Sequence, residues 1–194
     1  TWDTISFTPA GRFFYMAFAD SLRGIAFHID ECYKKSMVKT ADGGRTWSMM
    51  NELQGHVGNP HLMPSGFGCL GDGDELFFTS DYGETWDSIP SPLRYIRAIQ
   101  FLNREIGFIS DGYEDVGILK TVDGGISWDT ISKYGARFIN FFTPDDGFTI
   151  QATGTYLDYD VVGHCSGYLS TNDNGVNWTT DFPQYLNTGF PSFV

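Results

Sequence analysis

Short apolar segments alternate with polar turns along most of the chain. Three of them begin with a glycine six residues after a phenylalanine: Gly24–Phe27 after Phe18, Gly107–Ile109 after Phe101, and Gly147–Ile150 after Phe141. Other apolar segments end at a polar turn, as Gly117–Lys120 and Gly167–Ser170 do. Runs of this length, rich in aromatic and β-branched residues and bounded by glycine and polar clusters, predict β-strands. The hydrophobic pattern therefore predicts an all-β protein.

The polar turns carry a repeated motif, Thr-x-Asp-x-Gly-x-x-Trp, which occurs four times without a mismatch. Its aspartates are 39, 42 and 50 residues apart. A truncated copy opens the chain, because residues 2–5 repeat the Trp-Asp-Thr-Ile of residues 128–131. Such a period is typical of propeller and solenoid proteins. The motif residues are Thr40, Asp42, Gly44, Trp47, Thr79, Asp81, Gly83, Trp86, Thr121, Asp123, Gly125, Trp128, Thr171, Asp173, Gly175 and Trp178.

The chemistry of this motif is that of a turn. Aspartate accepts hydrogen bonds from backbone N–H groups, expected here one or two residues onward, and glycine supplies a positive φ. Tryptophan then begins the next strand and can lie over the turn as an apolar plug. We therefore interpret the motif residues as structural, and we do not expect the four aspartates to be catalytic.

Each repeat of about forty residues predicts four short antiparallel strands, which is typical of a propeller blade. The predicted fold is an all-β propeller in one domain, residues 1–194, with full blades at 6–50, 51–89, 90–131 and 132–180. Residues 1–5 and 182–194 predict partial strands of a preceding and a following blade. The chain is then part of a larger ring, or a small ring with an irregular closing blade. An open arc would expose apolar faces and would need self-association or missing blades.

The motif resembles the Asp box of the bacterial neuraminidase repeat superfamily. Residues 98–128 look most like the photosystem assembly and stability factor propellers. The resemblance implies a propeller fold and a location outside the cytoplasm, whether periplasmic, cell-surface or secreted. It says less about function, because the same box occurs in sialidases, xyloglucanases, sortilin-type receptors and noncatalytic scaffolds.

The chain is acidic, with a formal net charge of −12 from 24 acidic and 12 basic residues. Binding to nucleic acid depends on basic residues that displace counterions, so this charge argues against it. No apolar run approaches the length of a membrane span, so we predict no membrane insertion. Neither the histidines nor the cysteines have metal-ligand spacing, and we predict no metal and no cofactor. Cys32, Cys69 and Cys165 are expected to be buried free thiols.

Alignment of the predicted innermost strands places Arg97 and Arg137 at one position, with His56 and Phe14 at the corresponding places. Innermost strands border the central channel of a propeller, so Arg97, Arg137 and His56 are candidates to converge on an anion. Photosystem assembly factors, which the chain resembles, carry an arginine patch. The alternative is that each arginine pairs with an acidic neighbour or packs its stem against an aromatic ring.

The loops before the third strand of each repeat are acidic. Equivalent loops emerge on one face of a propeller, so they predict an acidic rim that could hold calcium or a cationic surface, or simply favour solubility. The longest of these loops contains Tyr156, Asp158, Tyr159 and Asp160, our favoured contact for a protein or glycan. The alternative is that the extra residues only lengthen a surface turn and have no binding role. The other acidic residues are Asp30, Glu31, Asp72, Asp74, Glu75, Asp111, Glu114 and Asp115.

Two functions fit these observations. The favoured one is a noncatalytic binding or scaffold propeller for a protein or glycan. The alternative is a glycoside hydrolase, sialidase-like or xyloglucanase-like, or a fragment of one. Hydrolysis needs two carboxyl groups, or in sialidases a tyrosine nucleophile. The chain has no Arg-x-Pro signature of the sialidases and no glutamate after Glu114, so we name no catalytic residue.

Overall fold

Antiparallel β-strands form all of the regular secondary structure in the residues that the structure describes. The structure is a computed structural model, and it describes residues 11–52, 58–111, 117–133, 135–136, 138–145, 147–153, 165–173 and 175–181. These residues form sixteen strands in four four-stranded sheets and contain no helix, hence none long and apolar enough to cross a lipid bilayer. The all-β prediction is confirmed for this part of the chain.

Each sheet is a meander whose strands follow one another in chain order. Sheet 1 contains β1 (Gly11–Phe18), β2 (Gly24–Asp30), β3 (Lys35–Thr40) and β4 (Ser48–Glu52). Sheet 2 contains β5 (His61–Leu62), β6 (Gly68–Asp72), β7 (Glu75–Thr79) and β8 (Asp87–Pro90). Sheet 3 contains β9 (Ala98–Phe101), β10 (Gly107–Ser110), β11 (Ile118–Thr121) and β12 (Asp129–Ser132). Sheet 4 contains β13 (Phe138–Phe141), β14 (Gly147–Thr153), β15 (Cys165–Thr171) and β16 (Thr179–Asp181).

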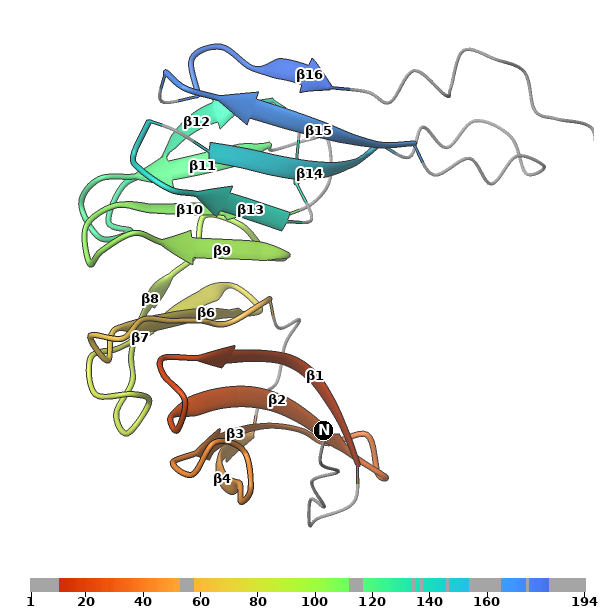
Figure 1. Cartoon of the computed structure of the whole chain (residues 1–194), viewed down its shortest axis with the longest axis vertical. Helices are drawn as coiled ribbons and strands as arrows, with labels where there is room; N and C mark the ends of the chain where they lie inside the picture. The colour runs from red at the N-terminus through yellow and green to blue at the C-terminus, as the bar shows by residue number, and fades with distance from the viewer. Residues whose placement is uncertain are drawn as a thin grey trace, which may run out of the picture.

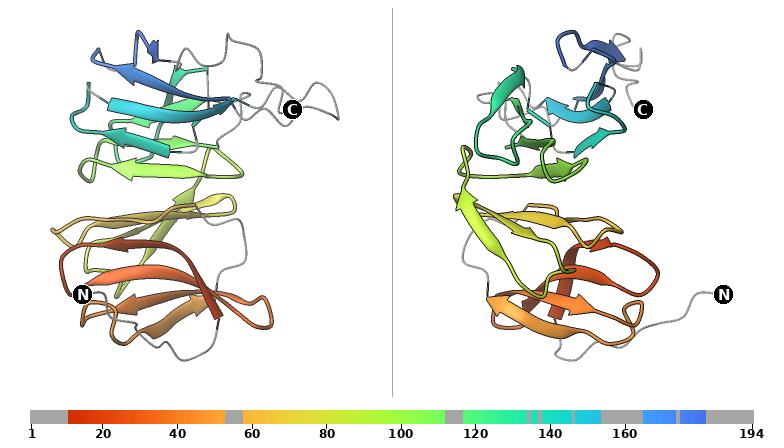
Figure 2. Two further views of the ribbon diagram at one scale, coloured as in Figure 1. Left: turned by 45° about the vertical axis from the view of Figure 1, so that its right-hand side comes forward. Right: turned by 90° about the vertical axis from the view of Figure 1, so that its left-hand side faces the viewer.

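The four sheets follow one another along an arc. β1 lies beside β5, β5 beside β9, and β9 beside β13, so the first strand of each sheet is its inner strand. Figures 1 and 2 show sheets 1 and 4 at opposite ends of the molecule. The described residues therefore form an open arc and not a closed ring. The terminal strands predicted at 1–5 and 182–194 lie outside the described residues.

A phenylalanine, a glycine and a threonine stand in one row across the sheets. In sheet 3, Phe101 of β9 is opposite Gly107 of β10, which is opposite Thr121 of β11. Sheets 1 and 4 repeat this row, and sheet 2 has Leu62 in place of the phenylalanine. A Cβ atom at Gly107 would lie 2.5 Å from the Phe101 ring. The six-residue spacing from phenylalanine to glycine is therefore a packing requirement.

Side-chain hydrogen bonds hold the turn between the third and fourth strands. Thr46 donates its N–H to Oδ1 of Asp42 at 2.8 Å and its hydroxyl to Oδ2 at 2.7 Å. The Thr40 hydroxyl donates to Asp42 Oδ1 at 2.8 Å and accepts the Gly44 N–H at 2.9 Å. The turns at Asp81, Asp123 and Asp173 repeat this pattern, with Thr85, Ser127 and Asn177 in the place of Thr46.

The backbone N–H that each turn aspartate accepts differs from the prediction. Each carboxylate accepts from the N–H four residues onward, not one or two residues onward. The reason is that two left-handed residues in succession, such as Gly43 (φ 74°) and Gly44 (φ 85°), curl the chain back toward the carboxylate. Tyr82 takes the first of these positions in the second turn with φ 62°. Its hydroxyl donates to Pro64 O at 2.9 Å, and the Arg23 guanidinium lies 3.7 Å from its ring centroid.

The tryptophans of the second, third and fourth motif turns each join their own sheet to the preceding sheet. Trp86 packs with a buried cluster that spans sheets 1 and 2, Trp128 with one that spans sheets 2 and 3, and Trp178 with one that spans sheets 3 and 4. The indole N–H of Trp86 and of Trp128 donates to the carbonyl of its own turn glycine at 3.0 Å. The indole N–H of Trp178 donates instead to Ile131 O of sheet 3 at 3.0 Å. The motif turns thus fix both the hairpins and the sheet-to-sheet packing.

The cysteines differ from the prediction in one case. Cys69 is buried, and burial raises the pKa of its thiol well above its ordinary value. Cys32 is exposed, because it lies in the turn between β2 and β3 and not in a strand of the sheet. The expectation of a buried thiol at Cys32 was wrong. The Cys165 side chain is not described.

We predict that Gly107→Ala lowers the free energy of unfolding by about 1–3 kcal/mol, because the new methyl group would overlap the buried Phe101 ring. Urea-induced unfolding measures this. The control is the same substitution in a Phe101→Ala background, where the overlap is removed and the second change should be neutral or stabilising. Equal effects in both backgrounds would contradict the packing requirement.

The turn aspartates predict an acid-sensitive stability. Hydrogen bonds from the residue four positions onward lower the pKa of Asp42, Asp81 and Asp123 from 3.8 to about 2. Because the folded-state pKa is the lower one, this contribution is complete above pH 3.8 and is lost as the pH falls through about 2. Asp123→Asn should therefore be less stable than the wild type at neutral pH, and urea midpoints of the two proteins should converge at about pH 2. A constant difference over this range would disprove the linkage.

Candidate binding site on the inner strands

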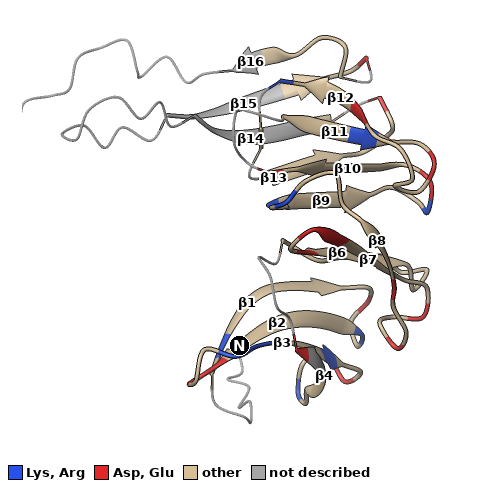
Figure 3. Ribbon diagram, turned by 180° about the vertical axis from the view of Figure 1, so that it is seen from behind, with Lys and Arg blue, Asp and Glu red and all other residues tan. Residues whose placement is uncertain are grey.

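The inner strands of all four sheets line one concave pocket of about 380 Å³. Figure 3 shows β1, β9 and β13 mostly tan, with charged residues chiefly at strand ends and in connecting segments. The site therefore lies where the arc of sheets brings four repeats together. Its lining residues are Met16, Asn59, Pro60, His61, Ala98, Ile99, Gln100, Phe138, Ile139 and Asn140.

This lining combines apolar surface with side-chain amides. Met16 and Phe138 are 53% and 44% exposed, which is unusual for such apolar residues and leaves them available for contact. Asn59, Gln100 and Asn140 add amide donors and acceptors. No aspartate or glutamate is among the described lining residues. Such a surface suits apolar side chains and the polar backbone of another chain, and it offers no carboxyl pair for acid–base chemistry.

Gln100 joins the inner strands of sheets 3 and 4. Its Nε2 donates to Phe141 O at 3.0 Å, and its Oε1 accepts the Phe141 N–H at 2.7 Å. Phe141 belongs to β13, which is the edge strand of sheet 4 on the pocket side. One amide thus satisfies both backbone groups of an edge residue that would otherwise depend on water or a ligand. The contact sets the spacing of β9 and β13 at the pocket.

His61 makes the corresponding contact one sheet earlier, where its side chain hydrogen-bonds to the backbone of Phe101. Burial lowers the pKa of His61 below 6.5, and the bond to Phe101 acts in the opposite direction. Within each inner strand, His61, Gln100 and Asn140 immediately precede the residue that faces the row glycine. We call these three residues the inner polar row.

None of the candidate binding residues named from the sequence is found among the described lining residues of this pocket. Arg97 is exposed immediately before β9 and is not among the lining residues, and its N–H donates to Ser110 O at 2.8 Å. Arg137 and His56 lie outside the described residues, as does the loop with Tyr156, Asp158, Tyr159 and Asp160. Convergence on an anion and contact through that loop remain predictions.

Sequence reasoning missed the inner polar row. A polar residue directly before the last residue of each of these inner strands, as in Gln100-Phe101 and Asn140-Phe141, is the signal that could have found it. That signal shows a recurring position but not the partner, because the backbone that Gln100 binds is 41 residues away in sequence.

One carboxylate of the acidic loops, that of Asp30, has a structural role. Asp30 accepts the N–H of Cys32 at 2.8 Å and of Lys34 at 2.9 Å, which closes the turn between β2 and β3. Glu114, Asp115, Asp158 and Asp160 are not described, so the rim itself remains a prediction. Among the residues that are described, no group of three or more histidines, cysteines or carboxylates is placed to hold a metal ion.

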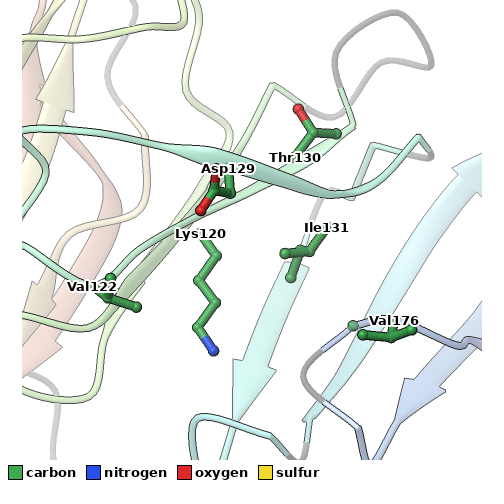
Figure 4. A pocket seen from close by; sticks show the side chains of 7 residues that line it. Lys120, Val122, Asp129, Thr130, Ile131 and Val176 are labelled. Carbon is green, nitrogen blue, oxygen red and sulfur yellow. The ribbon is translucent and has the colours of Figure 1, made fainter.

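A second pocket, of about 370 Å³, lies between sheets 3 and 4 (Figure 4). Lys120 lines it with Asp129 and Ile131 of the same sheet and Val176 of the next. The Lys120 ammonium donates to Pro144 O at 2.9 Å and lies 5.5 Å from the Phe108 ring centroid. Burial lowers the pKa of Lys120, and Asp145 opposes this. Since the ammonium already binds sheet 4, this pocket is a contact between sheets.

Comparison with known proteins supports the propeller interpretation. No protein-family model matches the chain. Two proteins described as photosystem II assembly protein Ycf48, from Synechococcus sp. strains JA-2-3B'a(2-13) and JA-3-3Ab, are each 32% identical over an alignment of 132 positions, which covers 59% of this chain. The chain is homologous to Ycf48 over this alignment. It spans only 38% and 37% of the length of these two relatives.

Solved structures with the same fold include a complex described as YCF48 bound to D1 peptide. It has 18% identity and a TM-score of 0.60, and covers 91% of this chain and 56% of that one. The GH74 enzyme of Niastella koreensis has 15% identity and a TM-score of 0.68, and covers 92% of this chain and 31% of that one. These neighbours are β-propellers. Identities this low show the fold alone.

We predict that Gln100→Ala lowers the free energy of unfolding by about 1–3 kcal/mol, because it leaves the N–H and C=O of the buried edge residue Phe141 without their side-chain partner. Urea-induced unfolding measures the loss. Asn59→Ala is the matched control, since it removes an amide of the same pocket with no hydrogen bond to a neighbouring inner strand, and it should change stability by less than about 0.5 kcal/mol. Equal losses of stability in Gln100→Ala and Asn59→Ala would contradict a specific contribution of the two Gln100 hydrogen bonds.

Proposed function

We propose that this chain is a noncatalytic binding module that holds a segment of another protein in the pocket of its inner strands. The observation that carries the proposal is the lining itself, with exposed Met16 and Phe138 beside the amides of the inner polar row and without carboxyl groups. Apolar anchors give a bound peptide its affinity, and nearby amides orient its backbone.

Homology to Ycf48 supports this proposal. One solved propeller of the same fold is described as bound to a D1 peptide, so this architecture can hold a peptide. The relatives are longer than the part that this chain matches, so residues beyond the aligned part could contribute to peptide binding in those proteins. The peptide partner of this chain is therefore argued from its own pocket and from the homology together.

A glycoside hydrolase is the second candidate, because GH74 enzymes share the fold. This likeness is structural only, at 15% identity or less. Hydrolysis of a glycosidic bond needs two carboxyl groups several ångströms apart on either side of it. The four turn aspartates are committed to their own hairpins, and the described pocket lining holds no carboxyl group. We therefore favour protein binding over glycan binding.

Asp-box membership is part of the same proposal. It is supported by the four equivalent turns, in which threonine, aspartate and glycine share one set of hydrogen bonds. A location outside the cytoplasm remains a prediction.

The test is binding of a fluorescent D1 peptide to the purified chain, followed by fluorescence anisotropy. We expect saturable binding that weakens about tenfold or more in Phe138→Ala, because this change removes an exposed aromatic anchor of the pocket. Ile126→Ala is the control, since Ile126 is 84% exposed on a motif turn away from the pocket, and it should leave the affinity unchanged.

Two results would contradict the proposal. The first is equal binding by the wild type and Phe138→Ala, which would place the peptide elsewhere. The second is no binding of D1 or of a displayed peptide library, together with release of reducing sugar from xyloglucan, which would favour the hydrolase.

A further inference from the structure

The pocket side of β13 carries backbone groups that the sheet itself does not use. In an antiparallel ladder, the N–H and C=O of every second residue point away from the neighbouring strand. Phe141 is such a residue, because its N–H and C=O bind the Gln100 side chain and not β14. Ile139 lies two residues earlier in the same strand, so its N–H and C=O point to the same side.

These backbone groups are what Ile139 offers to the pocket. Ile139 is a lining residue, yet its side chain is only 7% exposed and packs in the cluster between sheets 3 and 4. Apart from the ladder with β14, it makes no hydrogen bond with the residues that the structure describes. An edge N–H and C=O in this position need a partner from outside the sheet.

The inner strand of sheet 3 has the same backbone groups but a different neighbour. Phe101 is bound by His61 as Phe141 is bound by Gln100, so Ile99 also turns its N–H and C=O away from β10. The residue before Ile99 is Ala98, which is buried and gives an added strand little side chain to pack on. Phe138 holds this place in β13 and is 44% exposed. Since cross-strand side-chain pairs stabilise a sheet, β13 is the better edge for an added strand.

We propose that the partner of this pocket is an extended segment that adds to sheet 4 as a further strand along β13. One residue of the segment exchanges N–H···O=C bonds with Ile139, and its two neighbours lie opposite Phe138 and Asn140. This inference rests on the proposed function and specifies the chemistry of the partner. The segment has no helix or sheet of its own at this point and no proline at the bonded residue. The residue opposite Phe138 is apolar, and the one opposite the Asn140 amide is polar.

Gln100 limits the length of the added strand. Its amide already occupies the N–H and C=O of Phe141, so a docked segment can bond to Ile139 but not to Phe141. A contact restricted in this way suits a short extended segment in a pocket of about 380 Å³.

Methylation of the peptide backbone, one N–H at a time, tests this docking without changing the chain. The probe is the fluorescent D1 peptide, or a peptide selected from the displayed library where D1 does not bind. We expect one methylation, at the N–H that binds Ile139 C=O, to weaken binding about tenfold or more. Methylation of the residue before it and of the residue after it are the matched controls. Both should be tolerated, because these N–H groups point away from β13.

Gln100→Ala should change this pattern in a direction that only strand addition explains. It leaves the Phe141 N–H and C=O open, so a second sensitive N–H should appear two residues from the first along the peptide. Slow amide exchange in β10 and β11 is the reference that the sheets remain folded. If Gln100→Ala unfolds, the methylation series on the wild type still decides.

Amide exchange measured by NMR locates the docking on the chain itself. The Ile139 amide should exchange at least about tenfold more slowly when the peptide is bound. Slow exchange of Ile139 without peptide would overturn the proposal, because the edge would then be filled by the chain itself or by a second copy. Slowing at Ile99 and not at Ile139 would also overturn it and would move the peptide to β9.

The outcomes separate this inference from the proposed function. A peptide that binds the pocket with no sensitive N–H, or with all of them equally sensitive, would overturn strand addition and leave the proposed function standing. Binding of no peptide, from D1 or from the library, would overturn both.

Discussion

The hydrogen bonds around the four turn aspartates are the constraint on which the other contacts depend. Each carboxylate accepts an N–H and a side-chain donor from the residue four positions onward, and this holds two left-handed residues in the turn. The turn then places a tryptophan where the last strand of the sheet begins. From the second turn onward, this indole packs into the cluster shared with the preceding sheet. Local turn chemistry thereby controls the packing of one sheet on the next.

The inner edge of each sheet poses a different physical problem. An edge strand presents backbone N–H and C=O groups that need hydrogen-bond partners. In a pocket, these partners are water, side chains or a bound ligand. Gln100 and His61 solve this by binding the backbone of the following inner strand. The pocket therefore owes its shape to side chains that satisfy the edges of neighbouring sheets, while Met16 and Phe138 keep apolar surface exposed between them.

The same architecture carries peptide-bound and hydrolytic proteins, so the arrangement of sheets does not choose between them. The choice depends on which groups reach the concave surface. In the described part of this chain, those groups are amides, an imidazole and apolar side chains, while the turn carboxylates are engaged in the hairpin turns that follow each repeat's third strand. This chemistry favours recognition of another chain over bond cleavage.

The sequence by itself determined the strands, the repeat and the structural role of the motif, because these depend on contacts within about forty residues. The phenylalanine–glycine spacing and the Thr-Asp-Gly-Trp turns are local enough to be read directly. The prediction of which N–H binds the turn aspartate was wrong. Two successive left-handed residues bring the N–H of Thr46, rather than a nearer one, to Asp42. Only the tertiary structure decided the site. Arg97 occupies an inner-strand position in the alignment and yet lies outside the pocket lining, whereas Gln100 found its partner 41 residues away. Such a contact depends on how neighbouring sheets pack, and the periodicity of a single repeat carries no information about it.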